Sequence, residues 1–423
     1  MRFIADLHIH SKYSRATSRE MSPESIWKWA QLKGITVIGT GDVIHPQWFR
    51  ELEEKTEACG NGLYRLKDAY HTEDIPDLCR SDVFFLLSTE ISCIYRKYDR
   101  TRKIHAVVFL PDLSDAARLN RVLSKIGNIQ SDGRPILGLD AKELLSIVSD
   151  ISSDALFVPA HVWTPHFSVF GAASGFDSLE ECFDDLSHHI CAIETGLSSD
   201  PPMNWRLSAL DHITLISNSD AHSPAKIGRE ANIFDTDITY RDMIGAIRNK
   251  KGFLGTIEFF PEEGKYHYDG HRACGTCLSP AETVKHDYLC PVCGRKITIG
   301  VLHRVDKLSD REEGFKPEGA PAFFSLIPLQ EIISESLNLG VTSKAVQGRY
   351  FRLLQKLGSE FKILMDIPPE DIRNEASPVI SEAIDRMRSG NVSVRPGYDG
   401  EYGKISIFEK VQRKEIKGQK MLF

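Results

Sequence analysis

The segment RFIADLHIHS at residues 2–11 contains the pattern that decides the fold. Its apolar run, Phe3–Leu7, has the length and composition of a buried strand and stops just before His8 and His10. Because side chains two residues apart on a strand point to the same side, the two imidazoles can bind one ion. A histidine pair at the end of a buried strand therefore predicts a metal site.

Five further apolar runs end in the same way on residue types that bind metal. They are Ile35–Gly41 before Asp42, Val83–Thr89 before Glu90, Ala155–Ala160 before His161, Ile190–Ile193 before Glu194, and Ile213–Ser219 before Asp220 and His222. The carboxyl ends of parallel strands in a closed barrel meet on one face, so residues at those ends converge. We therefore predict an α/β barrel whose rim holds a polynuclear site. Mixed imidazole and carboxylate ligands suit zinc, manganese or iron.

His105 differs from the other candidates because it begins its apolar run, IHAVVFL, instead of ending it. If residues 83–90 and 104–110 are antiparallel neighbours, His105 reaches the same rim as Glu90. The basic segment between them carries Arg96 and Arg100. It is either a solvated hairpin tip or a ridge that grips phosphate beside the metals.

The loops that follow His161 and Glu194 contain aromatic and amide side chains that could contact a substrate. These are Trp163, Phe167, Phe170, Asn204 and Trp205. They could form a pocket in which rings stack on a nucleobase, or they could simply be packing. Asp220 and Glu194 are the candidate catalytic carboxylates. Glu194 is an outer ligand, a base that orients water, or the partner of a ligating histidine.

Composition limits the class of protein without revealing its function. The chain has 423 residues, a formal charge of −7 and nine cysteines. No apolar stretch approaches the roughly 20 residues of a membrane span, and the N-terminus enters a strand at once, so we expect a cytoplasmic protein without a membrane partner. The odd cysteine count favours reduced thiols and metal binding over a disulfide framework.

The chain divides into four parts and a linker. Residues 1–260 alternate strands with helical patterns such as 22–34, in which Ser22 is the expected N-cap and Gly34 the expected C-cap. A Cys- and His-rich module follows at 261–310, and a Gly/Pro-rich linker at 312–324. Residues 325–408 are mainly helical, and 409–423 are a charged tail.

The module contains two CxxC pairs separated by about a dozen residues. The four thiols belong to Cys274, Cys277, Cys290 and Cys293. Two such knuckles are typical of tetrahedral zinc bound by four thiolates. Because all four positions are filled by protein, we expect this zinc to be structural.

Residues 1–225 resemble the PHP family, the polymerase and histidinol phosphatase domain. DLHIHS, Asp42, Glu90 in STEIS, His105, His161 in PAH, and SDAH at 219–222 occur in the family's order. The resemblance implies a distorted seven-stranded β/α barrel that holds two or three divalent metals (zinc, manganese or magnesium), with Glu90 as a bridging ligand. Ala16 and Val43 stand where the family often has histidine, which favours two ions over three.

The order of barrel, cysteine knuckle and helical domain resembles the endonuclease Q family. TGLSSDPPMNWR at 195–206 and PGYDGEYG at 396–403 add to this resemblance. It implies a DNA-repair endonuclease that cleaves 5′ to deaminated bases (uracil, hypoxanthine, xanthine) or abasic sites, with damaged DNA as its partner. The alternatives are a small-molecule phosphatase like histidinol phosphatase and a non-enzymatic DNA-binding adaptor with a relic barrel.

The chain ends in Gln419-Lys420-Met421-Leu422-Phe423, or QKMLF. This Q-x-x-L-F pattern resembles the short peptides with which repair enzymes dock on DNA sliding clamps. In such a complex the glutamine would bind at the rim of a pocket that Leu422 and Phe423 fill. The alternative is an apolar end that folds back onto its own domain.

Overall fold

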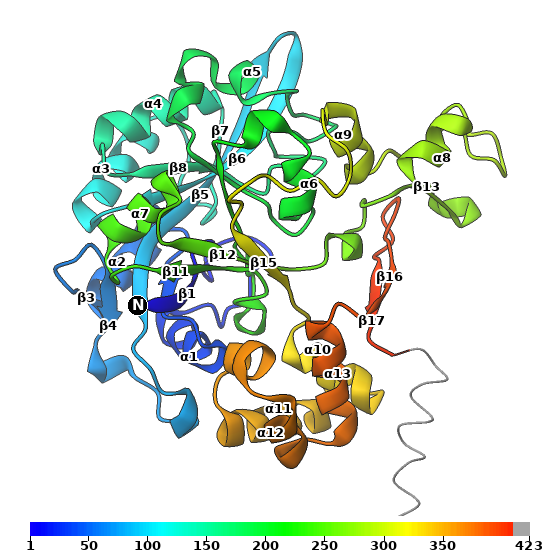
Figure 1. Ribbon diagram of the computed structural model, residues 1–423. Helices are drawn as coiled ribbons and strands as arrows, with labels where there is room; N and C mark the ends of the chain where they lie inside the picture. Colours follow the sequence, from blue (N-terminus) through cyan, green and yellow to red (C-terminus); the bar gives the residue numbers. More distant parts are fainter. Residues whose placement is uncertain (409–423) are drawn as a thin grey trace, which may run out of the picture.

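The computed structural model describes residues 1–408 and has a mixed α/β architecture built on one large sheet (Figure 1). The order in this sheet is β15 (Ala322–Ser325), β12 (Phe253–Glu258), β11 (Ala231–Asp235), β1 (Arg2–Asp6), β2 (Val37–Gly39), β5 (Phe84–Lys97), β4 (Tyr64–Leu66) and β3 (Thr56–Ala58). From β5 the sheet also extends to β7 (Ile136–Leu137) and through β6 (Arg100–Leu110) to β8 (Leu156–Pro159). The mixed α/β class expected from the sequence is confirmed.

A separate parallel pair, β9 (Ala192–Glu194) and β10 (Thr214–Ile216), stands between β8 and β1. Backbone hydrogen bonds join it to both neighbours: Val162 N donates to Glu194 O at 3.0 Å, and Asp220 N donates to His8 O at 2.9 Å. These bonds lie just beyond the strand ends. The strands therefore converge at the rim where the candidate metal residues lie.

Helices cover the outside of this strand assembly (Figure 1). They are α1 (Pro23–Lys33), α2 (Pro46–Lys55), α3 (Leu113–Leu123), α4 (Ala141–Ile151), α5 (Leu179–Phe183), α6 (Pro201–Trp205) and α7 (Tyr240–Asn249). In α1 the Ser22 hydroxyl accepts from Ser25 N, and Gly34 is left-handed with φ 88°, as the sequence predicts.

The antiparallel pairing expected for residues 83–90 and 104–110 is also confirmed. β5 and β6 form a long antiparallel hairpin in which Ser92 pairs with His105. This hairpin projects beyond the rest of the sheet at the top of Figure 1. Its register places His105 close to Glu90, two residues before Ser92.

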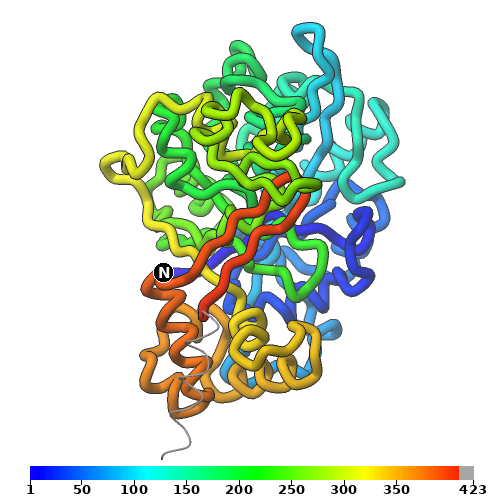
Figure 2. The backbone as a smooth tube through the Cα atoms, turned by 90° about the vertical axis from the view of Figure 1, so that its right-hand side faces the viewer, coloured from blue at the N-terminus to red at the C-terminus, as the bar shows by residue number. Residues whose placement is uncertain are grey.

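The cysteine-rich module contains a small hairpin and two helices. They are β13 (Asp269–His271), β14 (Thr276–Leu278), α8 (Pro280–Lys285) and α9 (Val301–Leu308). The C-terminal hairpin, β16 (Ser393–Arg395) and β17 (Lys404–Ser406), lies beside the module (Figure 2). A bridge between Tyr268 and Tyr398 joins the two. The segment 396–403 therefore contacts the cysteine-rich module.

Four helices form the remainder: α10 (Leu329–Leu337), α11 (Lys344–Leu357), α12 (Pro369–Glu375) and α13 (Pro378–Arg388). They pack beneath α1 (Figure 1), where Lys33 Nζ lies 2.8 Å from Glu360 Oε2 in a buried ion pair. The end of the expected linker adds β15 to the large sheet beside β12. The helical part is therefore anchored to the strand assembly and its helices on two sides.

Within residues 1–408, no helix combines the length and the apolar character that crossing a membrane requires. The tail 409–423, including the clamp-like QKMLF peptide, lies outside the described residues.

Candidate metal centre

Glu90 joins two groups of side chains at the rim of the strand assembly. The first group is His8, His10, Glu90 and Asp220, and the second is Glu90, His105 and His161. Within each group, one ligand atom from each residue lies within 4.8 Å of the others. These residues follow the ends of β1, β8 and β10 or lie within β5 and β6, so folding brings together much of the ligand set predicted from the sequence.

The two oxygens of Glu90 face different groups. Oε1 lies 2.6 Å from His105 Nδ1 and 3.1 Å from His161 Nε2. Oε2 lies 3.2 Å from His10 Nε2 and 3.6 Å from His8 Nε2. A carboxylate shared in this way is suited to bridging two metal ions.

Three buried polar atoms of the first group have no hydrogen-bond partner among residues 1–408. They are His8 Nε2, His10 Nε2 and Asp220 Oδ1. His10 Nε2 and Asp220 Oδ1 approach to 2.9 Å without forming a hydrogen bond. Unpaired polar atoms that are buried and converge are costly unless a cation lies between them, so this group fits a metal ion.

Asp42 lies behind His10, outside both metal groups. Its Oδ1 is 3.1 Å from His10 Nδ1, and its Oδ2 accepts hydrogen bonds from Ser11 N, Ser11 Oγ and Ser14 Oγ. Both oxygens are therefore engaged. The sequence placed Asp42 among the metal ligands, but the structure gives it the outer position of a carboxylate that orients a ligating histidine.

Glu194 holds the equivalent position behind His8. Its oxygens lie 3.0 and 3.1 Å from His8 Nδ1 and accept hydrogen bonds from His161 N and Asn218 Nδ2. Of the three roles open for Glu194, this geometry supports partnership with a histidine. Together, Asp42 and Glu194 leave both Nε2 atoms facing the first group.

His222 lies at the edge of the first group. Its ring centroid is 4.4 Å from that of His10, and its Nδ1 lies 2.9 Å from the backbone oxygen of Asp220. The ring belongs to neither metal group. The predicted pairing of His222 with Asp220 on one ion is therefore not reproduced by this arrangement.

The electrostatics couple the carboxylates of the rim to its histidines. Burial lowers the pKa of His8 and His10, but Glu194 beside His8 and Asp42 beside His10 outweigh it, and both pKa values are raised well above the usual value.

Burial raises the pKa of Glu90, but the charges of His105 and Arg134 outweigh it and hold the pKa well below its usual value. Burial lowers the pKa of His105 to about 4 despite the nearby Glu90. Glu90 is therefore ionised near pH 7, which is the form in which a carboxylate binds a metal ion.

Several of these residues have left-handed backbone angles that turn the chain sharply after a strand. Asp42, His161 and Asp220 have φ of 48°, 30° and 46°. A Cβ at Gly196 would lie 2.3 Å from His161 Cβ, so the neighbouring turn needs glycine. Such strain is retained where surrounding contacts fix the geometry, and it often occurs at functional sites.

The predicted base pocket is largely absent because most of its members are in the core. Trp163 and Phe170 are buried with ring centroids 4.9 Å apart, and Trp163 Nε1 donates to Asn204 Oδ1 at 2.8 Å. These three side chains satisfy one another and line no opening at the metals. Phe167 is different: it is half-buried, has φ 60°, and lies 4.6 Å from the His105 ring.

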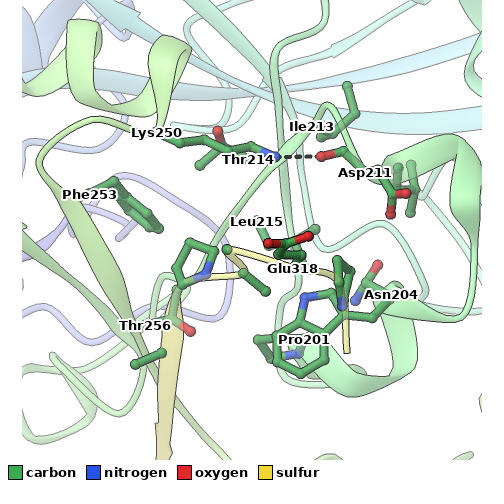
Figure 3. Close-up of a pocket in the computed structure, with 17 residues that line it drawn as sticks. Pro201, Asn204, Asp211, Ile213, Thr214, Leu215, Lys250, Phe253, Thr256 and Glu318 are labelled. Carbon is green, nitrogen blue, oxygen red and sulfur yellow. Dashed lines mark hydrogen bonds between the residues drawn. The ribbon is translucent and has the colours of Figure 1, made fainter. Parts of the chain in front are cut away.

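Trp205 faces a different opening, a pocket of about 110 Å³ shown in Figure 3. This pocket lies where β10 and β12 begin and under the segment 317–322, with Lys250 and Phe253 on its wall. The candidate metal residues follow the opposite end of β10. The pocket shares no residue with either metal group.

Arg96 and Arg100 lie at the tip of the β5–β6 hairpin. Both are exposed, and Arg96 Nη2 contacts Asp99 at 3.4 Å. They belong to the projecting hairpin and do not contact the metal groups.

The cysteine-rich module has a third candidate metal group: His271, Cys274, Cys290 and Cys293. Thr276 Oγ1 lies 3.4 Å from Cys290 Sγ, so Thr276 faces the group and Cys277, next on β14, faces away. His271 pairs with Thr276 across the hairpin and takes the fourth position. The structure thus departs from the predicted four-cysteine set, and H-x-x-C was the overlooked signal.

Sequence reasoning also missed Arg134, whose Nη1 lies 3.1 Å from Glu90 Oε2. Arg134 lies in a loop where no repeating pattern marks it. In all, the geometry describes an α/β protein with a candidate binuclear metal centre.

Comparison with known proteins identifies the family. The chain is similar over its whole length to the crystal structure of the lesion-specific endonuclease PfuEndoQ from Pyrococcus furiosus, with TM-score 0.85, 32% identity and 100% of both chains covered. It is also similar to endonuclease Q in complex with a 27-mer duplex substrate with an abasic lesion at the active site, with TM-score 0.82 and 33% identity over 97% of this chain and 98% of that one. The chain therefore belongs to the endonuclease Q family.

The chain is also similar to two other proteins in sequence. YqxK of Bacillus subtilis is 31% identical over 418 residues, which is 95% of this chain and 98% of YqxK. MJ0043 of Methanocaldococcus jannaschii is 33% identical over 253 residues, or 58% of this chain, but the match spans only 31% of MJ0043. The family described as the MJ0043 C-terminal domain matches residues 328–391.

The outer position of Asp42 predicts a graded effect on metal binding. In Asp42→Asn the amide would face the donors Ser11 N and Ser14 Oγ, so His10 should lose its fixed orientation. We expect metal affinity of the barrel to fall about 10–100-fold, as for other outer carboxylates. Metal titration by calorimetry measures this, with the exposed Asp82→Asn as control. Unchanged affinity in Asp42→Asn would show that Asp42 does not orient His10.

The membership of the third group leads to a prediction about which substitutions release the ion of the cysteine-rich module. Cys290→Ser and His271→Ala should each lose zinc, whereas Cys277→Ser should keep it, because Cys277 faces away from the group. Elemental analysis after dialysis measures the zinc content per chain. If Cys277→Ser loses zinc and His271→Ala keeps it, the zinc is bound by the four cysteines that the sequence predicted, and the group with His271 is wrong.

Proposed function

We propose that this protein is a metal-dependent DNA endonuclease of repair that hydrolyses the phosphodiester bond 5′ to deaminated bases or abasic sites. The observation that carries the proposal is the full-length similarity to endonuclease Q, including a complex with an abasic lesion at the active site. The two groups that meet at Glu90 add the chemistry that phosphodiester hydrolysis needs.

We assign the ligands of two divalent ions (zinc, manganese or magnesium) to the two barrel groups. Bound there, the ions would supply Lewis acidity and lower the pKa of water. Glu90 would hold both ions at a fixed separation. Asp42 and Glu194 would keep the Nδ1 protons of His10 and His8 in place, so that each Nε2 remains a ligand.

The seven strands of the expected barrel correspond, in this proposal, to β1, β2, β5, β6, β8, β9 and β10. Each contains or immediately precedes a residue of the predicted site. We retain residues 1–260 as the barrel domain, 261–310 as a module with one structural zinc, and 325–408 as the DNA-binding domain. The contacts between Tyr268 and Tyr398 and between Lys33 and Glu360 support a single rigid frame for these parts.

Contact with the damaged strand is assigned to Phe167 and to the hairpin tip. The Phe167 ring lies beside His105 and under Lys103 Nζ, which is 5.4 Å from its centroid. A half-exposed ring next to the reaction centre is suited to stacking on a base displaced from the duplex. Arg96 and Arg100 would contact the phosphate backbone farther away.

The two alternative functions account for fewer features of the structure. A small-molecule phosphatase would use the same barrel groups but would not need the module and the helical part, both of which are covered by the endonuclease Q similarity. A non-enzymatic adaptor would not need two groups of buried, ionised ligands that meet at one carboxylate.

The proposal predicts the effect of Asp220→Asn. This variant removes a charged ligand of the first group, so nicking of a duplex that contains uracil, hypoxanthine or an abasic site should fall by more than about 100-fold, beyond the loss typical of an outer residue. Binding to the same duplex should persist. A gel assay of a labelled duplex measures the nick, and a lesion-free duplex and p-nitrophenyl phosphate test specificity.

The exposed Asp237→Asn serves as the matched control and should nick at the wild-type rate. Full nicking by Asp220→Asn would contradict the assignment of the metals. Wild-type protein that hydrolyses p-nitrophenyl phosphate but leaves every lesion duplex intact would favour the small-molecule phosphatase.

A further inference from the structure

Arg134 makes the only ion pair between an arginine or lysine and a barrel metal group within residues 1–408. Its Nη1 lies 3.1 Å from Glu90 Oε2, and its side chain is 27% exposed. Arg229, also nearby, donates instead to the backbone oxygens of Ser219 and Asp220. The Arg134 guanidinium is thus the cation that reaches from solvent to the centre of the rim.

The loop that carries Arg134 is fixed against the rim. Gly133 N donates to Tyr13 O at 3.0 Å, and Arg134 N donates to Asp132 Oδ1 at 3.2 Å. A Cβ at Gly133 would lie 2.3 Å from Asp42 Oδ2, so glycine is needed for the loop to pass this close. The chain then enters β7, which pairs with β5, the strand of the bridging carboxylate. The position of Arg134 is therefore set by the same scaffold as the ligands.

The charges around Arg134 indicate what it binds when the barrel ions are present. Two divalent ions carry more positive charge than Glu90 and Asp220 neutralise, and both carboxylates would then be committed to the ions. Glu90 alone offsets only part of the repulsion between this guanidinium and the ions, so a further anion between them is favourable. The anion that a phosphoester hydrolase brings to this place is its substrate.

We propose that Arg134 is a phosphate-binding residue that donates to a nonbridging oxygen of the scissile phosphoester and stabilises the charge that develops there. This inference rests on the proposed function of the same site. The planar fork of arginine donates two parallel hydrogen bonds to a phosphate, which lysine cannot do. In this role Arg134 contacts the reacting group directly.

A purely structural role for Arg134, as the counter-ion of Glu90, leads to different results. Removing a counter-ion would change metal content or stability, whereas removing a phosphate ligand would change phosphate binding at constant metal content. The two roles are therefore separated by measuring both quantities on the same variants.

The experiment compares Arg134→Gln and Arg134→Lys with the wild-type full chain. Calorimetry with inorganic phosphate as the probe is performed on the metal-loaded protein, after elemental analysis has established equal metal content. We expect phosphate affinity to fall at least about tenfold in Arg134→Gln and less in Arg134→Lys. For a lesion duplex, kcat should fall about 100–1000-fold in Arg134→Gln, as when another charge-stabilising donor is removed, with partial recovery in Arg134→Lys.

The matched control is Arg118→Gln. Arg118 lies on α3, pairs with Asp115 and donates to Ile151 O, so it should retain wild-type values. Unchanged phosphate affinity in Arg134→Gln would overturn the inference, and so would loss of metal from that variant. If the wild type binds phosphate through Arg134 but nicks no lesion duplex, the proposed function fails while this inference stands.

Discussion

The buried carboxylate of Glu90 is the constraint on which the rest of the site depends. One of its oxygens faces His105 and His161, and the other faces His8 and His10. Burying a negative charge is costly unless cations compensate it. Strands that are distant in sequence must therefore converge around β5, because each supplies part of that compensation. The long β5–β6 hairpin places both Glu90 and His105 within one continuous element.

Two carboxylates behind the histidines fix the orientation of the rings that converge on Glu90. Asp42 and Glu194 hold the far sides of the His10 and His8 rings, and backbone bonds from His161 N and Ser11 N hold the two carboxylates in turn. The layer fixes the direction of each ring before any ion binds. The pre-arranged rim explains why several of its residues have left-handed backbone angles.

Much of the fold and of the ligand set could be predicted because strand ends are visible in the sequence. Apolar runs that stop on His8 or Asp220 carry that information directly, whereas β5 continues past Glu90 to Lys97. The inner or outer position of Asp42 depends on how the chain turns after its strand, which no pattern records. His271 was missed because the β13–β14 hairpin is short and side chains alternate between its two faces. Only the structure shows that His271, and not Cys277, lies on the face of the other cysteines. Trp163 and Phe170 look like pocket residues in sequence, yet packing against Asn204 places them in the core.

Counting metal ions in the wild type and in Glu90→Gln tests the central claim most directly. Elemental analysis of the dialysed full chain should find two ions in the barrel and one in the cysteine-rich module of the wild type. Because Glu90 belongs to both barrel groups, the Glu90→Gln protein, which has a neutral amide in place of the carboxylate, should lose both barrel ions. It should keep the ion of the cysteine-rich module. A Glu90→Gln protein that keeps both barrel ions would contradict the account.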